Sequence, residues 1–87
     1  MPITTSDRST ASLLARVARG EGRTLRVTTV SGTAYYLGPR PDAQWDIVRV
    51  PRAGSESHEI GQVRSNSSDL TIGTWVTTGL HSVELMP

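Results

Sequence analysis

The stretch of residues 24–37, TLRVTTVSGTAYYL, decides the fold that we expect. Two runs rich in Thr, Val, Leu and Tyr flank a Ser-Gly pair, and these residue types suit a pleated, half-buried strand. A two-residue turn at Ser31 and Gly32 would place Thr28 opposite Tyr35. The stretch is therefore predicted to form a β-hairpin around which the chain is organised.

Side chains alternate between the two faces of a strand, so this pairing predicts both faces of the hairpin. The first face would carry Leu25, Val27, Thr29, Ala34 and Tyr36. The second face would carry Arg26, Thr28, Val30, Thr33, Tyr35 and Leu37. We expect the first face to meet a helix, whereas the second must be covered by something else or used as a contact surface.

A helix is predicted over residues 8–19, after an N-terminal arm of residues 1–6. Apolar residues such as Leu13 and Val17 recur at about the helical period, and Gly20 is a favourable terminator because it adopts positive φ without strain. A helix this short is marginal alone, so we expect it to dock on the sheet.

The rest of the chain contains β-prone runs separated by turn-forming residues. They predict a strand over residues 45–50, a weaker strand over 58–64 with a bulge at Gly61, a strand over 70–78, and a closing strand over 80–85. With the hairpin, the β-rich part covers residues 23–85 of a single domain, residues 7–87. We therefore expect a β-rich α+β fold, with the N-terminal helix packed on a small five- or six-stranded antiparallel barrel or curved sheet.

The composition narrows the classes of function. The 87-residue chain has a formal net charge of +1 and no Cys, so neither a disulfide framework nor a thiolate metal site is available. All nine basic residues are arginine; this lysine-free composition is typical of a GC-rich genome, although guanidinium groups also suit phosphate and carboxylate recognition. No apolar run reaches the ~18 residues of a membrane span and no signal layout is present, so we expect a cytoplasmic protein.

Residues that could perform catalysis do not form a recognisable pattern. His81 and Glu84 are three apart and so point to opposite faces of a strand, and His58 is merely adjacent to Glu59. The sequence contains no nucleophile elbow and no Gly-rich phosphate loop. We expect a non-enzymatic protein with no cofactor, no metal and no small-molecule substrate.

A protein-binding, self-associating module is the function that we expect. Apolar residues on both faces of several strands need more cover than one short helix supplies, and Trp, Tyr and Arg are enriched at binding hot spots. A two-fold homodimer is the expected assembly. The hypothetical binding surface consists of Arg26, Tyr35, Leu37, Trp45, Arg49 and Trp75.

A small nucleic-acid-binding barrel is the alternative. Such barrels combine basic groups with aromatic stacking platforms. The residues that could supply these groups are Arg23, Arg26, Arg49 and Arg52 with Tyr35 and Trp45. The net charge of only +1 argues against this function, because phosphate-binding domains are usually more basic.

The order of three motifs resembles a group of small uncharacterised proteins of actinobacteria and their phages. The motifs are TVSGTAYYL at residues 29–37, WDIVRV at 45–50 and TIGTWVTTGLHSVEL at 71–85. The resemblance implies an actinobacterial or phage origin and carries no activity with it. A phage origin would imply a stoichiometric inhibitor of a host factor.

Overall fold

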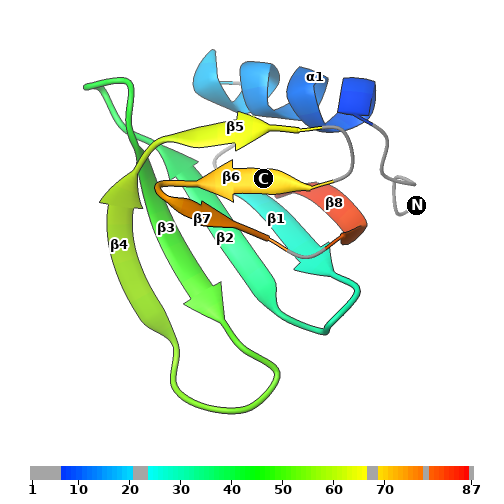
Figure 1. Ribbon diagram of the computed structural model, residues 1–87. Coiled ribbons are helices and arrows are strands. Elements are labelled where there is room, and N and C mark those ends of the chain that lie inside the picture. Colours follow the sequence, from blue (N-terminus) through cyan, green and yellow to red (C-terminus); the bar gives the residue numbers. More distant parts are fainter. Residues whose placement is uncertain (1–6, 21–23, 67–68, 78, 87) are drawn as a thin grey trace.

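The computed structural model describes residues 7–20, 24–66, 69–77 and 79–86 (Figure 1). Within these ranges the chain forms one helix, α1 (Asp7–Ala18), and eight strands in two antiparallel sheets. The strands are β1 (Thr24–Thr29), β2 (Ala34–Pro39), β3 (Trp45–Val50), β4 (Ser57–Gly61), β5 (Val63–Ser65), β6 (Leu70–Ile72), β7 (Trp75–Val76) and β8 (Leu80–Met86). The prediction of a β-rich α+β fold is confirmed.

The two sheets have separate strand orders, and this separation rules out the closed barrel that was one of the predicted forms. The larger sheet has the order β4-β3-β2-β1-β8 and the smaller sheet has the order β5-β6-β7. The chain passes from one sheet to the other at Gln62, between β4 and β5. Because β4 and β8 end the larger sheet without pairing to the smaller one, the fold is two layered sheets with open edges.

The described strands number eight rather than five or six because two predicted strands are each divided. The run over residues 58–64 changes sheet at Gln62, whose carbonyl accepts a hydrogen bond from the Gly73 N–H at 2.7 Å. The run over 70–78 folds back on itself through a two-residue turn at Gly73 and Thr74, and Gly73 has a φ of 63°. The predicted single strand is therefore the β6–β7 hairpin.

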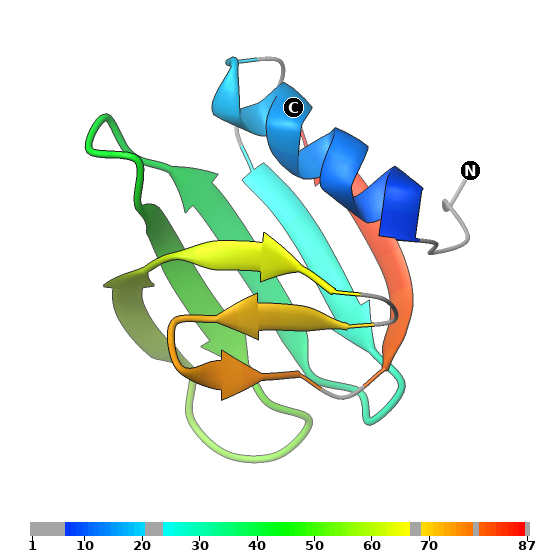
Figure 2. The same cartoon turned by 45° about the horizontal axis from the view of Figure 1, so that its top comes forward.

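The core lies between the larger sheet and a second layer made of α1 and the smaller sheet, which cover the same face (Figure 2). Helix α1 contributes Leu13, Leu14 and Val17, three buried residues at helical spacing. Val17 also accepts a hydrogen bond from the N–H of Gly20, whose φ of 90° ends the helix as expected. The strands contribute Leu25, Val27, Tyr35, Leu37, Trp45, Ile47, Leu70, Ile72 and Val83.

The β1–β2 hairpin exists, but its register differs from the prediction by one residue. Its loop has three residues, because the N–H of Thr29 donates to the carbonyl of Thr33 at 2.9 Å, and Gly32 adopts a φ of 91°. Val27 therefore pairs with Tyr35. A shift of one residue moves every side chain of one strand to the other face. The predicted faces of the second strand are thus wrong: Tyr35 and Leu37 are buried, whereas Tyr36 lies on the outer face.

The outer face of the larger sheet is covered by none of the described elements. A row of paired residues crosses it from one edge to the other, and this row consists of Glu84, Arg26, Tyr36, Val48 and His58. Most of this face is half-buried, since neighbouring side chains cover one another. The outer face of the hairpin carries the apolar ring of Tyr36, whereas Tyr35 and Leu37, which were predicted to make that face apolar, lie on the inner face.

Candidate functional site

Three of the six residues predicted for a binding surface meet at one cleft between the two sheets. They are Tyr35 on β2, Arg49 on β3 and Trp75 on β7, and the cleft has a volume of about 230 Å³. Glu59, Ile72 and Thr74 complete the lining, and we call this site the β7 cleft. The guanidinium carbon of Arg49 lies 5.7 Å from the centroid of the Trp75 ring, within the range of a cation–π contact.

Local pairing explains how these side chains converge. Tyr35 and Arg49 are direct cross-strand partners in the β2–β3 pair, so both project from the same face of the larger sheet. Trp75 pairs with Ile72 across the tight β6–β7 turn, so it projects from the core-facing side of the smaller sheet. The two sheets therefore present these three residues to each other.

Trp75 is 56% exposed although it shares a face with the buried Ile72. The cause is its position, because β7 is the last strand of the smaller sheet. Leu70 and Ile72 on β6 are flanked by strands on both sides, and both are buried. Trp75 thus faces the core but remains half-covered, because the smaller sheet ends at β7 and no further described strand lies beside it.

The β7 cleft contains hydrogen-bond donors without protein partners. The hydroxyl of Tyr35 lines the cleft, and within the described residues no hydrogen bond to it is found, although the residue as a whole is only 4% exposed. The Nε of Arg49 is buried and also has no hydrogen-bond partner in that part of the chain. Leaving the buried Nε of Arg49 unsatisfied costs about 1–3 kcal/mol, so this guanidinium favours a ligand that brings oxygen acceptors.

Glu59 places a negative charge in the same cleft. It belongs to β4 and pairs with Ile47, so it lies diagonally across the β3–β4 pair from Arg49 and on the same face. No ion pair joins Glu59 to Arg49 within the described residues. The charge of Arg49 therefore remains available to a ligand.

The other three predicted surface residues lie elsewhere. Leu37 and Trp45 are buried in the core, as is Tyr35 at the bottom of the cleft, so the expectation that these three residues form part of an exposed surface is wrong. Leu37 is buried because of the register shift, and Trp45 is buried because it faces inward beside Pro39 and Gly61. Arg26 lies on the outer face of the larger sheet between Tyr36 and Glu84, so it is separated from Tyr35 by the thickness of the hairpin.

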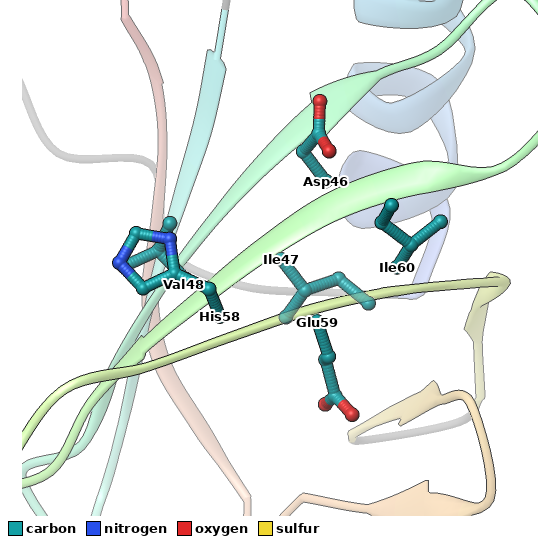
Figure 3. Close-up of a pocket in the computed structure, with 6 residues that line it drawn as sticks. All are labelled: Asp46, Ile47, Val48, His58, Glu59 and Ile60. Atoms are coloured by element: carbon teal, nitrogen blue, oxygen red, sulfur yellow. The ribbon is translucent and has the colours of Figure 1, made fainter.

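A second and larger hollow, of about 370 Å³, lies along β3 and β4 (Figure 3). His58 and Val48 lie together on one face, whereas the Glu59 carboxylate points away from them (Figure 3). The Nε2 atom of His58 lies 3.4 Å from the Oε1 atom of Glu56. The Glu59 carboxylate lies on the face opposite Asp46 and His58, so this hollow does not direct its three polar groups at a common point.

The two histidines lie far apart in the fold. His58 belongs to β4 and His81 to β8, and these strands form opposite edges of the larger sheet. Within the described ranges, no group of three or more His, Asp or Glu side chains is placed to hold a metal ion.

Three residues of the cleft were not foreseen from the sequence: Glu59, Ile72 and Thr74. Pairing the run at residues 45–50 with the run that follows it would have placed Glu59 near Arg49. Recognising Gly73 and Thr74 as a turn, rather than as the middle of a strand, would have placed Thr74 beside Trp75.

Comparison of the chain with models of protein families, with curated proteins and with solved structures found no match. Among the described residues, no helix is long and apolar enough to cross a membrane.

Proposed function

We propose that the protein is a non-catalytic protein-binding module whose contact surface is the β7 cleft and the exposed side chains beside it. The observation that carries this proposal is Trp75, a core-facing residue that is left 56% exposed at the end of its sheet. Val76, its neighbour on β7, is also exposed. Exposed aromatic and aliphatic side chains around a cation are typical of the centre of a protein interface.

The distribution of the arginines supports a protein partner over a nucleic acid. Arg26 lies on the outer face of the larger sheet, and Arg49 lies in the cleft between the sheets. Arg40 forms ion pairs with Asp42 at 3.5 Å and with Asp46 at 3.1 Å. The hydrogen bond with Asp46 and the charge of Asp42 both raise the pKa of Arg40. A groove that follows a phosphate backbone needs its cations on one surface, and Glu59 adds a repulsive charge at the cleft.

The lining of the cleft supports a binding role rather than catalysis. A nucleophile needs a base within hydrogen-bonding reach to activate it. The hydroxyls that line the cleft belong to Tyr35 and Thr74, and the lining contains no histidine. The single carboxylate, Glu59, forms no hydrogen bond with either hydroxyl within the described residues.

The proposal is tested by capture from an extract of a GC-rich bacterium, treated with nuclease and analysed by mass spectrometry. The bait is the full chain in three forms: wild type, Trp75→Ala and Ile60→Ala. Ile60 is a matched control, because it is 54% exposed but lies on the opposite face of the larger sheet. Circular dichroism and thermal unfolding would establish that both variants are folded.

We expect a stoichiometric protein partner that wild type and Ile60→Ala capture and that Trp75→Ala does not. Loss of the partner with Ile60→Ala instead would move the contact surface to the outer face and contradict the proposal. Recovery of nucleic acid from an untreated extract, with no protein partner, would favour the nucleic-acid-binding alternative. Recovery of the bait alone would also contradict the proposal.

A further inference from the structure

We propose that the β7 cleft takes an extended peptide segment of another protein, which joins the smaller sheet beside β7 and places an acidic side chain against Arg49. This inference rests on the proposed function and specifies the partner as a strand-forming segment in which apolar and acidic residues alternate. Peptides that add to a sheet edge gain affinity from main-chain hydrogen bonds and specificity from alternate side chains.

The free edge of β7 presents unpaired backbone groups. The N–H of Thr77 donates to the carbonyl of Leu70 at 2.9 Å, and the N–H of Leu70 donates to the hydroxyl of Thr77 at 3.0 Å, so Leu70 and Thr77 are hydrogen-bonded to each other. In an antiparallel ladder such pairs alternate with non-hydrogen-bonded pairs, and the next pair is Thr71 with Val76. The N–H and C=O of Val76 therefore point away from β6, toward the open edge, where an added strand can bond to both.

Two of the other edge strands, β5 and β4, are less suited to this role. The opposite edge of the smaller sheet is β5, which lies against α1 (Figure 1). The β4 edge of the larger sheet carries the charged Glu59 beside the exposed Ile60, and a charged side chain is a common means of preventing edge pairing. The β7 edge instead carries the exposed apolar side chains of Trp75 and Val76.

The space beside β7 suits a single strand better than a second copy of this protein. The start of β2, the end of β3 and the loop over residues 51–56 extend past β7 in both views (Figures 1 and 2). A second copy approaching edge to edge would meet this overhang, whereas an isolated strand can lie across it. The cleft volume of about 230 Å³ is below the ~300–1,000 Å³ of small-molecule pockets, so it suits one or two side chains.

The polar groups of the cleft define the chemistry of the inserted side chain. Arg49 and Tyr35 both offer donors without protein partners, and a carboxylate can accept from both. Trp75 and Ile72 supply an apolar wall for the neighbouring residue of the same face. Glu59 would repel the incoming carboxylate, which gives the proposal a distinctive signature: removing that charge should strengthen binding.

The test is a selection of random linear twelve-residue peptides, displayed on phage, against the immobilised full chain. We expect the enriched peptides to alternate apolar residues with Asp or Glu. Their synthetic forms should lose about 10-fold or more in affinity against Trp75→Ala and against Arg49→Gln. They should gain about 2- to 5-fold against Glu59→Gln and should be unaffected by Ile60→Ala. Tyr35→Phe should weaken binding without removing the buried ring.

The outcomes separate this inference from the function on which it rests. Peptides that depend on Trp75 but carry no acidic residue, or that bind Glu59→Gln no better than wild type, would overturn the acidic-strand inference while supporting the cleft as a protein-binding site. Peptides that bind Trp75→Ala as well as wild type would overturn both, and so would a selection with no enrichment.

Discussion

The guanidinium carbon of Arg49 lies 5.7 Å from the centroid of the Trp75 ring, and this contact joins the larger sheet to the last strand of the smaller one. It is a contact between residues 26 positions apart, so only the layering of the two sheets creates it. Arg49 thereby holds Trp75 over the cleft without covering its outer side.

Because of this contact, we expect the effects of the two side chains on the free energy of unfolding to be coupled. A partly exposed cation–π pair contributes about 0.5–1 kcal/mol. A double-mutant cycle with Arg49→Ala and Trp75→Ala, measured by urea unfolding, should give a coupling free energy in that range. The control cycle combines Trp75→Ala with Arg64→Ala, since Arg64 is exposed on β5. Additive effects in the first cycle would contradict the contact.

The register of the central hairpin predicts different costs for its two tyrosines. Tyr35 is buried in the core, and replacing a large buried aromatic residue by alanine costs about 3–5 kcal/mol. Tyr36 lies on the outer face and is only half-buried, so Tyr36→Ala should cost about 1 kcal/mol. Denaturant unfolding of the two variants measures this difference, and the reverse order would support the register that the sequence alone suggested.

The hairpin loop predicts a strict requirement for glycine at position 32. Gly32 has a φ of 91°, and an added Cβ would lie 3.2 Å from the Cδ of Arg52. Gly32→Ala should therefore lower the free energy of unfolding by about 1–2 kcal/mol. Gly79→Ala is the control, because its Cβ would meet only Val30 at 3.9 Å and should change stability by less than about 0.5 kcal/mol. Thermal unfolding measures the stability of both variants, and an equal loss of stability for the two would contradict the requirement for glycine at position 32.

We expect the buried hydroxyl of Thr77 to contribute to the stability of the fold. Its Oγ1 accepts a hydrogen bond from the N–H of Leu70 at 3.0 Å, and both residues are buried. Thr77→Val would leave that N–H without this partner and should cost about 1–3 kcal/mol. The same substitution at Thr28, a half-buried residue of the outer face, should be nearly neutral because valine suits a strand. Equal unfolding midpoints for the two variants would argue against a structural role for the Thr77 hydroxyl.

Self-association stays a prediction, and the outer face of the larger sheet is the surface on which we expect it. This face carries Tyr36, Val48 and Val50, and no described element covers it. Light scattering at micromolar concentration should give the mass of two chains, and Val48→Asp should reduce it to that of one. Val30→Asp is the matched control, because Val30 is exposed in the hairpin loop. A monomeric mass for the wild-type chain would contradict the prediction.

Local sequence signals determined the elements that depend on short-range physics. The apolar period of Leu13 and Val17, followed by Gly20, predicted a helix within one residue of α1 at each end. The β-prone run WDIVRV predicted the bounds of β3. These features depend on side-chain spacing and backbone freedom within one segment, so they can be read without knowledge of the rest of the chain.

The register of the hairpin could not be read in the same way. The apolar run Tyr35, Tyr36 and Leu37 is continuous, so it fits the core on either face. A Ser-Gly pair fits a two-residue turn, and Gly32 also fits the last position of a three-residue loop. Burial of Tyr35 and Leu37 in the core, together with the hydrogen bonds between Thr29 and Thr33, decides between the two registers.

The β7 cleft is decided by tertiary structure alone. The sequence singled out Tyr35, Arg49 and Trp75, but it grouped them with Leu37 and Trp45, and the core buries Tyr35, Leu37 and Trp45 alike. Three strands from two sheets bring the first three residues together, and the end of the smaller sheet at β7 leaves Trp75 exposed. Residue type shows which side chains can bind a partner, whereas only the layering of the sheets determines which of them stay accessible.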